Sequence, residues 1–328
     1  MSSAPILTFR LAEADEKPRI VAFMDANWGA AHPLIHREDF FAFYYQNNTA
    51  LQFAFAEEAG ALVALAGYIR ANNSVSPDIW VSIWCAVKGK NGAGLELMAA
   101  LPRLVGARCM ACNNIRPKTM PFYTFLGYTA ARLPHFYRLA RLPHLCDYTV
   151  AKIAHQPLLR AGGTAVLTKI TDENMLAQVF LPDDALRPAK DIWYLARRYF
   201  HYPHQKYDVW TSENTLLVTR TVAVHGTNVL RIVDYIGKPA FFANLGGAIS
   251  ILMQTEHAEY ADCYCYGIDA EIFAAAGFSE RTESDPNIIP NYLTPLLQEN
   301  TEYYFFTDTT EHFTMWKADG DQDRPNIL

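Results

Sequence analysis

The sequence predicts an α/β (α+β) fold in which two domains of the same plan follow one another. A length of 328 residues suits about two domains at roughly 150 residues each. Strand-like and helix-like runs occur in the same order in both halves. Val87, at the end of a strand-like run, lies 40 positions before Gly127, and Ile236 lies 41 positions before Gly277. Because the two glycines are also 150 positions apart, the sequence indicates a duplicated fold.

The first half combines helical periodicity with strand-like alternation. Residues 20–45 repeat with a helical period that is interrupted near 29–33, and residues 51–70 hold two strand-like runs around a turn at Gly60. The expected elements that follow are a nearly continuous apolar strand over 78–87, a breaker at 88–92, a helix over 93–104, a strand over 107–112 and a short helix over 120–128 that ends at a glycine.

The second half repeats this order. The expected elements are strands over 207–210, 215–224 and 229–236, a helix over 243–254, a strand over 262–266 and a short helix that ends at Gly277. Prolines and glycines break the pattern at residues 142–163, which therefore contain the predicted boundary. We expect one domain over residues 1–150 and the other over 151–328.

Composition excludes several classes of protein. Hydrophobic residues make up 51% of the chain and charged residues 19%, which is typical of a globular protein and not of a disordered one. Net charge is −6, so we expect no general affinity for nucleic acid. No apolar stretch reaches the length of a membrane span, and we expect no membrane partner. The six cysteines lie within apolar runs and the first residues lack a secretion signal, so we expect a reduced, cytoplasmic protein.

Small residues over 89–94 join the first long strand to a helix. Backbone N–H groups and the positive end of the helix could face a phosphate there, but a glycine-rich turn also occurs where two elements simply pack closely. The loop is neither Gly-x-Gly-x-x-Gly nor a Walker loop, because no Gly-Lys-Ser/Thr follows. Nucleotide hydrolysis is therefore not expected.

The strand that ends Cys85-Ala-Val87, this loop, Asn114 and Phe122-Tyr123 before Gly127 resemble the Gcn5-related N-acetyltransferase superfamily. The resemblance implies two tandem domains, each a mixed, mostly antiparallel sheet flanked by helices, and acyl-coenzyme A as a co-substrate with no tightly bound cofactor. Gly92 and Gly94 fill the two glycine positions of the family's [Arg/Gln]-x-x-Gly-x-[Gly/Ala] motif, and Gly89 replaces its Arg/Gln. The residues implied for coenzyme A are Ala86, Val87, Lys88, Lys90, Gly92, Ala93, Gly94 and Asn114.

Tyr123 matches the tyrosine that protonates the departing thiolate in much of this superfamily. A phenol with a reference pKa of about 10 suits that task. The alternative is that Tyr123 only packs its helix beside Phe122 and Phe125. In the reaction that the resemblance implies, N–H groups at Ala86 and Val87 would stabilise the negative charge that develops on the thioester oxygen.

A second resemblance covers most of the chain. The runs at 24–28, 198–203, 258–262 and 289–292, and above all Lys-Ala-Asp-Gly-Asp-Gln-Asp-Arg-Pro-Asn at 317–326, resemble tandem proteins of bacterial surface-polysaccharide gene clusters. This implies transfer to the amine of a nucleotide-linked amino-deoxysugar, with dTDP or UDP as the nucleotide. The residues implied for substrate binding are Trp28, Arg198, His201, Lys317, Asp319, Asp321 and Arg324. The acidic run could equally be a solvated tail.

The second copy lacks the residues that chemistry would need. Its loop contains Pro239, Phe241 and Phe242, which withhold an N–H group and fill the space of a phosphate. Phe273 stands where Tyr123 stands in the first copy and has no proton to give. We expect this domain to shape the acceptor pocket without performing chemistry.

We expect no metal site. The acids at 319–323 lack the glycine and the glutamate that a calcium loop needs, and the Cys-x-x-Cys at 109–112 falls in a predicted strand without a partner pair. For the base that takes the amine proton, His32 and Asp234 are the candidates. Asp234 interrupts an apolar strand, where a carboxylate needs a partner such as Arg231 or a ligand amine.

The sequence thus predicts an enzyme that moves an acyl group from acyl-coenzyme A to a nucleotide-linked aminosugar by direct attack, in polysaccharide biosynthesis. One alternative is a tandem acetyltransferase acting on a small amine or an amino acid. The other is a coenzyme A-binding protein without catalysis. The acyl chain, the sugar and the oligomeric state, with a homo-oligomer among the options, do not follow from the sequence.

Overall fold

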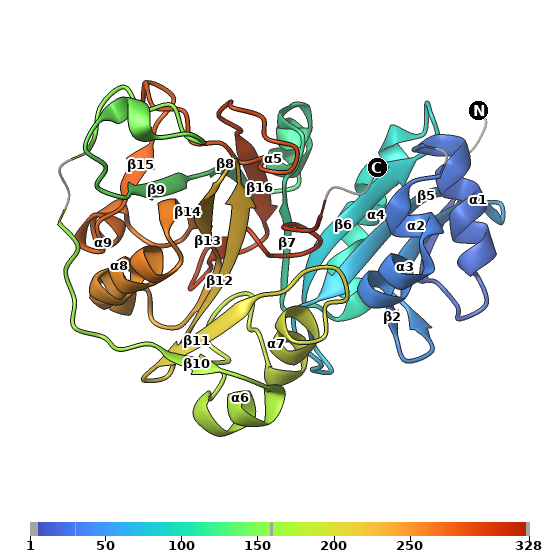
Figure 1. Ribbon diagram of the computed structural model, residues 1–328. Coiled ribbons are helices and arrows are strands. Elements are labelled where there is room, and N and C mark those ends of the chain that lie inside the picture. Colours follow the sequence, from blue (N-terminus) through green and yellow to red (C-terminus); the bar gives the residue numbers. More distant parts are fainter. Residues whose placement is uncertain (1–5, 30, 158–159, 326–328) are drawn as a thin grey trace.

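Two large mixed sheets, each covered by helices, make up the protein (Figure 1). The structure is a computed structural model, and it describes residues 6–29, 31–157 and 160–325. The predicted α+β architecture is confirmed, because both sheets are mixed and have helices packed on them. Within the described residues, no helix is both long and apolar enough to cross a membrane.

The first sheet has seven strands. In spatial order they are β1 (Leu7–Leu11), β4 (Phe53–Glu58), β5 (Ala61–Arg70), β6 (Asp78–Ala86), β7 (Cys109–Asn113), β16 (Tyr303–Thr307) and β8 (Thr129–Leu133). All neighbours are antiparallel except β6 and β7, which are parallel. This one parallel pair lies near the centre of the sheet.

The second sheet has the same plan. Its strands are, in spatial order, β10 (Thr168–Ile170), β11 (Asp208–Ser212), β12 (Thr215–Val224), β13 (Thr227–Ile236), β14 (Ala258–Tyr266), β9 (His135–Leu139) and β15 (Ser279–Arg281), with β17 (Met315–Trp316) paired to β14. Its one parallel pair, β13 with β14, corresponds to β6 with β7. A small separate hairpin is formed by β2 (Gln46–Asn47) and β3 (Ala50–Leu51).

The two sheets exchange strands. Strand β9, from the first half of the chain, lies between β14 and β15 of the second sheet. Strand β16, from the second half, lies between β7 and β8 of the first sheet. The division at residues 150/151 therefore does not separate the sheets, because each one is completed by a strand from the other side of that point.

Helices flank both sheets, and all but α6 and α7 overlap predicted helical segments. In chain order they are α1 (Lys17–Asn27), α2 (Pro33–His36), α3 (Glu38–Tyr45), α4 (Asn91–Val105), α5 (Met120–Phe125), α6 (Glu173–Val179), α7 (Ile192–Tyr199), α8 (Gly246–Thr255) and α9 (Ala270–Ala275). Short 3-10 turns lie at Pro117–Thr119, Leu145–Asp147 and Pro239–Leu245. The predicted helix over 243–254 thus begins as a 3-10 turn. Nine strands were not predicted, namely β1, β2, β3, β8, β9, β10, β15, β16 and β17.

Alternation along β4 explains the layers of the first sheet. Ala54 and Ala56 point to the face that α4 covers, and their small side chains belong to the same core as Leu97 of that helix. Phe53 and Phe55 point to the opposite face, into the core formed with α1 to α3. The sheet is therefore buried on both faces and holds β6 and β7 rigidly at its centre.

Candidate active site

Strands β6 and β7 run parallel for only a short distance. Their ladder covers residues 78–80 of β6 and 109–111 of β7, whereas β6 continues to Ala86. The register of β5 with β6 also shifts, from Gly67 opposite Ile83 to Tyr68 opposite Val81, so that Ser82 is the extra residue of a bulge. Residues 81–86 of β6 therefore present an edge that no strand in the described part of the chain pairs.

Backbone N–H groups of this edge are available to a ligand. The Val87 N–H donates to the carbonyl of Val63 at 2.9 Å, so it points toward β5. Successive N–H groups of a strand alternate in direction, and that of Ala86 therefore points toward β7. The Val87 N–H is thus taken up by β5, whereas the Ala86 N–H is directed into the divergence and remains the candidate donor to the thioester.

The loop after β6 leads directly into helix α4. Gly89 has a φ of 86°, a conformation that favours glycine. Lys88 is exposed, and Lys90 Nζ pairs with Glu58 Oε2 at 2.5 Å on the protein surface. Ala93 is buried at the start of the helix, and its N–H donates to the Lys90 carbonyl at 3.0 Å.

Gly92 and Gly94 have different surroundings. A Cβ atom on Gly94 would lie 3.1 Å from Ala86 Cβ, and the Gly94 carbonyl accepts from Trp84 Nε1 at 2.9 Å. This glycine lets the helix approach the strand. A Cβ atom on Gly92 would have no heavy atom within 4 Å, so a side chain there would enter the open space in front of the helix.

Tyr123 lies on α5 and is buried. Its ring stacks on Phe306 of β16 with centroids 4.1 Å apart and an interplanar angle of 20°, and it contacts Trp84 at 5.6 Å. Burial, together with the nearby Cys112 thiol, raises the pKa of the Tyr123 phenol. The ring therefore packs as one of the two alternatives expects, and its hydroxyl stays protonated at neutral pH, as a proton donor requires.

The opposite side of the sheet is lined by the first helices. Trp28 and His32 stack with ring centroids 4.5 Å apart. His32 Nδ1 accepts the Leu34 N–H at 3.3 Å, so the neutral ring carries its proton on Nε2. Burial lowers the pKa of His32, and the positive charge of Arg324 lowers it further. The imidazole is therefore neutral at physiological pH.

Two hydroxyl groups that sequence patterns do not single out lie on the same side. Tyr45 of α3 and Ser82 of the β6 bulge approach to 2.7 Å between their oxygens. Burial raises the pKa of Tyr45 and lowers that of His32. At both groups the charge of Asp321 raises the pKa and that of Arg324 lowers it, so both charges lie near both rings. Arg324 also donates a hydrogen bond to Asp321. The structure thus brings together four predicted substrate-side residues, Trp28, His32, Asp321 and Arg324, near the unpaired edge of β6.

Residues 315–324 form a buried segment and not a solvated tail. Strand β17 pairs with Cys265 and Tyr266 of β14, and the Ala318 N–H donates to the Val233 carbonyl of β13 at 3.0 Å. Since β13 and β14 pair directly only over Asn228–Arg231, this segment fills the position that corresponds to the β6–β7 divergence. Asn326, the last residue of the matched run, lies outside the described residues.

The 315–324 segment then crosses to the first sheet, as the red end of the chain shows in Figure 1. Asn113 Nδ2 donates to the carbonyls of Trp316 and Lys317, at 3.0 and 3.3 Å. Asn114 Nδ2 donates to Gln322 Oε1 at 3.2 Å, so this residue holds the segment in addition to any role toward coenzyme A. Asn113, which was missed, is the better buried of the two.

Several predicted substrate residues anchor this segment instead of facing the first site. Arg198 is buried and donates to the Gln322 carbonyl at 2.8 Å. Lys190 Nζ lies between Asp234, at 2.7 Å, and Asp319, at 2.6 Å. Tyr199 also donates to Asp234. The suggested partner Arg231 is wrong, because Arg231 bonds to Asp262 at 2.9 Å.

Lys317 and His201 lie apart from the four grouped residues. Lys317 is buried, with Nζ 4.6 Å from the ring centroid of Tyr303, and burial lowers the pKa of its amine to about 7. His201 is exposed and pairs with Glu173 at 2.9 Å. The structure therefore does not place either side chain beside His32.

In the second copy, other parts of the chain fill the divergence between β13 and β14 and the space at the start of α8. These two places correspond to the β6–β7 divergence and the loop before α4 in the first copy. Besides the 315–324 segment, the linker reaches the start of α8, where the Gly247 N–H donates to the Gly162 carbonyl at 2.9 Å. Phe242 is fully buried in the 3-10 turn before the helix. Phe273 stacks on Phe136 of the exchanged strand β9 with centroids 3.9 Å apart, as Tyr123 does on Phe306.

No family model matches the sequence, and no curated protein matches it. Among solved structures, a conserved protein of unknown function from Enterococcus faecalis, described as a probable N-acyltransferase, matches with a TM-score of 0.52 at 12% identity over 93% of this chain and 73% of that one. The chain shares the fold of that protein. Structures of two Gcn5-related N-acetyltransferases also match. The one from Anabaena variabilis has 9% identity and a TM-score of 0.49, over 92% of this chain and 72% of that one. The one from Kribbella flavida has 12% identity and a TM-score of 0.47, over 94% of this chain and 72% of that one.

Proposed function

We propose that this protein is an acyl-coenzyme A-dependent N-acyltransferase whose acceptor is the amine of a nucleotide-linked amino-deoxysugar. The observation that carries the proposal is the divergence of β6 from β7, with an N–H group of Ala86 directed into it. The open N-terminal loop of α4 lies beside it, and the buried phenol of Tyr123 lies on the neighbouring helix. The fold shared with a probable N-acyltransferase supports the same reaction class.

In the proposed reaction, the amine nitrogen forms a bond to the acyl carbon and the carbon–sulfur bond breaks. The Ala86 N–H stabilises negative charge on the thioester oxygen, and Tyr123 gives its proton to the thiolate. His32 is the proposed base, because it lies with Asp321 and Arg324 and its ring is neutral. Taking up a proton at Nδ1 requires release of the 3.3 Å bond from the Leu34 N–H.

Asp234 is a weaker candidate for the base. Its carboxylate is fully buried and accepts bonds from Lys190, Tyr199 and the Tyr235 N–H. A substrate amine would have to displace these donors to reach the carboxylate. We therefore assign Asp234 to the anchoring of the 315–324 segment through Lys190.

The nucleotide sugar is proposed from the sequence resemblance over residues 317–326 and from the position of Asp321 and Arg324 within that run. Arg324 can form charge-assisted hydrogen bonds to a diphosphate, and Asp321 orients its guanidinium. The second copy supports the first by holding the 315–324 segment that carries both residues. Because the chain itself fills the β13–β14 divergence and the start of α8, the second copy has no room for coenzyme A at these two places. This supports a single coenzyme A site per chain.

Release of free thiol from acetyl-coenzyme A tests the function directly. The acceptor panel contains UDP- and dTDP-linked aminosugars, free aminosugars, small amines and amino acids. Turnover with a nucleotide-linked aminosugar alone is the expected result. Turnover only with small amines or amino acids would favour the tandem acetyltransferase alternative, and coenzyme A binding without turnover on any acceptor would favour a non-catalytic protein.

A further inference from the structure

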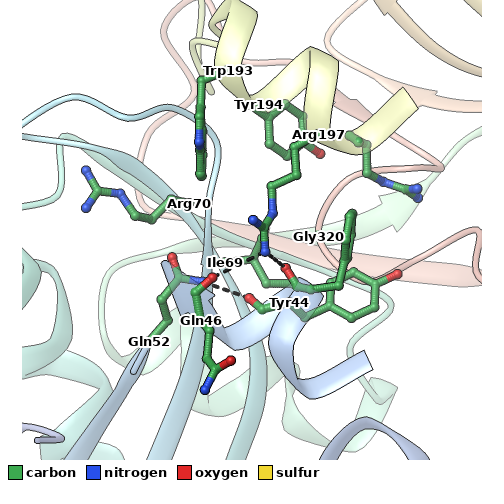
Figure 2. Close-up of a pocket in the computed structure, with 11 residues that line it drawn as sticks. Tyr44, Gln46, Gln52, Ile69, Arg70, Trp193, Tyr194, Arg197 and Gly320 are labelled. Atoms are coloured by element: carbon green, nitrogen blue, oxygen red, sulfur yellow. Dashed lines mark hydrogen bonds between the residues drawn. The ribbon is translucent and has the colours of Figure 1, made fainter. Parts of the chain in front are cut away.

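A small pocket lies between helix α3, the end of β5 and helix α7, and nothing above assigns it a role (Figure 2). Gly320 of the 315–324 segment closes one side of it. The residues that matter for its chemistry are Gln52, Trp193, Arg197 and Gln46. The cavity itself has a volume of about 20 Å³, and it opens into a wider mouth that brings the space to about 340 Å³.

Gln52 offers an unused acceptor to this pocket. The residue is only 5% exposed, and its Nε2 donates to the Tyr44 carbonyl at 2.7 Å. That bond fixes which end of the carboxamide is the oxygen. Within the described residues Oε1 has no hydrogen-bond partner. A buried acceptor without a donor is costly, so Oε1 points to a ligand that brings an N–H or O–H group.

Arg197 offers donors next to that acceptor. In the described part of the chain its three hydrogen bonds all come from Nη2, to the carbonyls of Ala42, Phe43 and Gln46. No carboxylate pairs with Arg197 among these residues, and burial lowers its pKa. Nη1 and Nε are thus free to donate to a ligand oxygen.

The remaining wall is flat and apolar. Figure 2 shows the indole of Trp193 descending from α7 over the space that the Gln52 carboxamide faces, with the Arg197 side chain beside it. An aromatic ring opposite an adjacent acceptor and donor is complementary to a planar heterocycle. The imide edge of uracil or thymine has this pattern, because its N–H lies between two carbonyl oxygens.

We propose that this pocket binds the uracil or thymine base of the acceptor, with N3–H donating to Gln52 Oε1 and a flanking carbonyl accepting from Arg197. The inference rests on the proposed function in treating the base as part of the acceptor. Position supports it, since Tyr44 and Gly320 line the pocket while their chain neighbours Tyr45 and Asp321 face the candidate active site. A nucleotide sugar would therefore extend from the pocket past Arg324 toward β6.

Isothermal titration of the full chain with UDP, dTDP, CDP and ADP, without coenzyme A, tests the pocket separately from catalysis. UDP or dTDP should bind more tightly than CDP and ADP. Trp193→Leu should weaken that binding by about tenfold or more, the size expected for a lost base–aromatic stack. Gln52→Met should remove the preference between bases, because it deletes the acceptor of the N3–H.

The matched control is Trp210→Leu. Trp210 is also a half-buried tryptophan, but it lies on β11 of the second sheet. Its substitution should leave nucleotide affinity unchanged. Equal binding of all four nucleotides to the wild type, absence of nucleotide binding, or unchanged affinity in a folded Trp193→Leu variant would overturn the inference.

Failure of the proposed function would look different. Base-selective binding without thiol release on any acceptor would contradict the acyltransferase and leave the pocket assignment intact. Turnover of a nucleotide-linked aminosugar at wild-type KM in folded Trp193→Leu and Gln52→Met would contradict the pocket and leave the acyltransferase intact.

Discussion

Phe306 stacks on Tyr123 although 183 residues separate them in the chain, and their ring centroids are 4.1 Å apart. The contact exists because β16 completes the first sheet from the second half of the chain. At the equivalent position of the second copy, Phe136 of β9 stacks on Phe273. The two exchanged strands therefore support the two corresponding helices in the same way, and only one helix carries a hydroxyl.

Tyr123→Phe should fold normally, because Phe273 shows that a phenylalanine ring fits this stack. Turnover should fall on the order of 10² to 10⁴-fold, the usual range for general acid catalysis, while affinity for acyl-coenzyme A stays near that of the wild type. Single-turnover thiol release and calorimetry measure the two quantities. Unchanged turnover with chemistry rate-limiting would leave Tyr123 with a packing role alone.

Gly92→Val and Gly94→Val should separate ligand binding from folding. The first variant places its side chain in open space, so it should keep its melting temperature and lose coenzyme A affinity about tenfold or more if phosphate bonds to the loop N–H groups are lost. The second should lower the melting temperature, because a Cβ atom already lies 3.1 Å from Ala86 Cβ. Calorimetry should also show one coenzyme A site per chain in the wild type. Two equivalent sites, or a Gly92→Val variant with normal affinity, would show that the loop has been assigned wrongly.

Arg324→Ala should raise KM for the nucleotide sugar and leave KM for acyl-coenzyme A unchanged, because the guanidinium lies on the side of Tyr45 and His32. Loss of one charge-assisted contact to a diphosphate corresponds to roughly tenfold. Asp321→Asn, which retains the side-chain shape, should have a smaller effect. Deletion of residues 317–328 is the poorer test, because it removes the segment that fills the second sheet. If both variants are stable and their sugar kinetics are normal, the segment does not contact the acceptor.

Asp234→Asn should destabilise the protein by about 1.5–3 kcal/mol, because hydrogen bonds to a buried carboxylate are lost while Asp319 still pairs with Lys190. Urea unfolding measures this loss. At temperatures where the variant is folded, kcat should stay near that of the wild type. A fall in kcat of about 10²-fold or more in the folded variant would instead identify Asp234 as the base and contradict its anchoring role.

Lys317 should make stability depend on pH. Its pKa is about 7 in the folded protein and near the ordinary 10.5 after unfolding, so the unfolded chain binds more protons between these values. Stability should therefore rise as pH increases from 7 toward 10, and Lys317→Met should remove this rise. Lys88→Met, at an exposed lysine, is the control, and urea unfolding at pH 7, 8 and 9 is the measurement. An equal rise in wild type and Lys317→Met would place the titration elsewhere.

Local patterns predicted most helices and the longer central strands of both sheets, because periodicity reports which face of an element is buried. The strand exchange could not be predicted in this way, since the partners of β9 and β16 are set by contacts between residues far apart in the chain. The wrong partner suggested for Asp234, Arg231, has the same cause. Arg231 is three residues away on the same strand, whereas the actual partner Lys190 comes from a loop 44 residues earlier.

The candidate site was predicted unevenly. Gly92, Gly94 and Tyr123 occupy motif positions, so their places beside β6 could be anticipated. Ser82 could not be found, because a bulge depends on the register of β5 against β6. Gln52 gives no sequence signal either, since one glutamine before an apolar strand is ordinary and only its unpaired oxygen distinguishes it.

The exchanged strands also determine when the molecule can fold during synthesis. A ribosome that has added residue 300 has already produced six of the seven strands of the first sheet, but β7 and β8 still lack the strand that joins them. Phe306, the stacking partner of Tyr123, and Arg324, which is proposed to bind the acceptor, are made later still. We therefore expect the two halves to become protease-resistant together, after residues 303–324 emerge, and not one after the other as independent domains do.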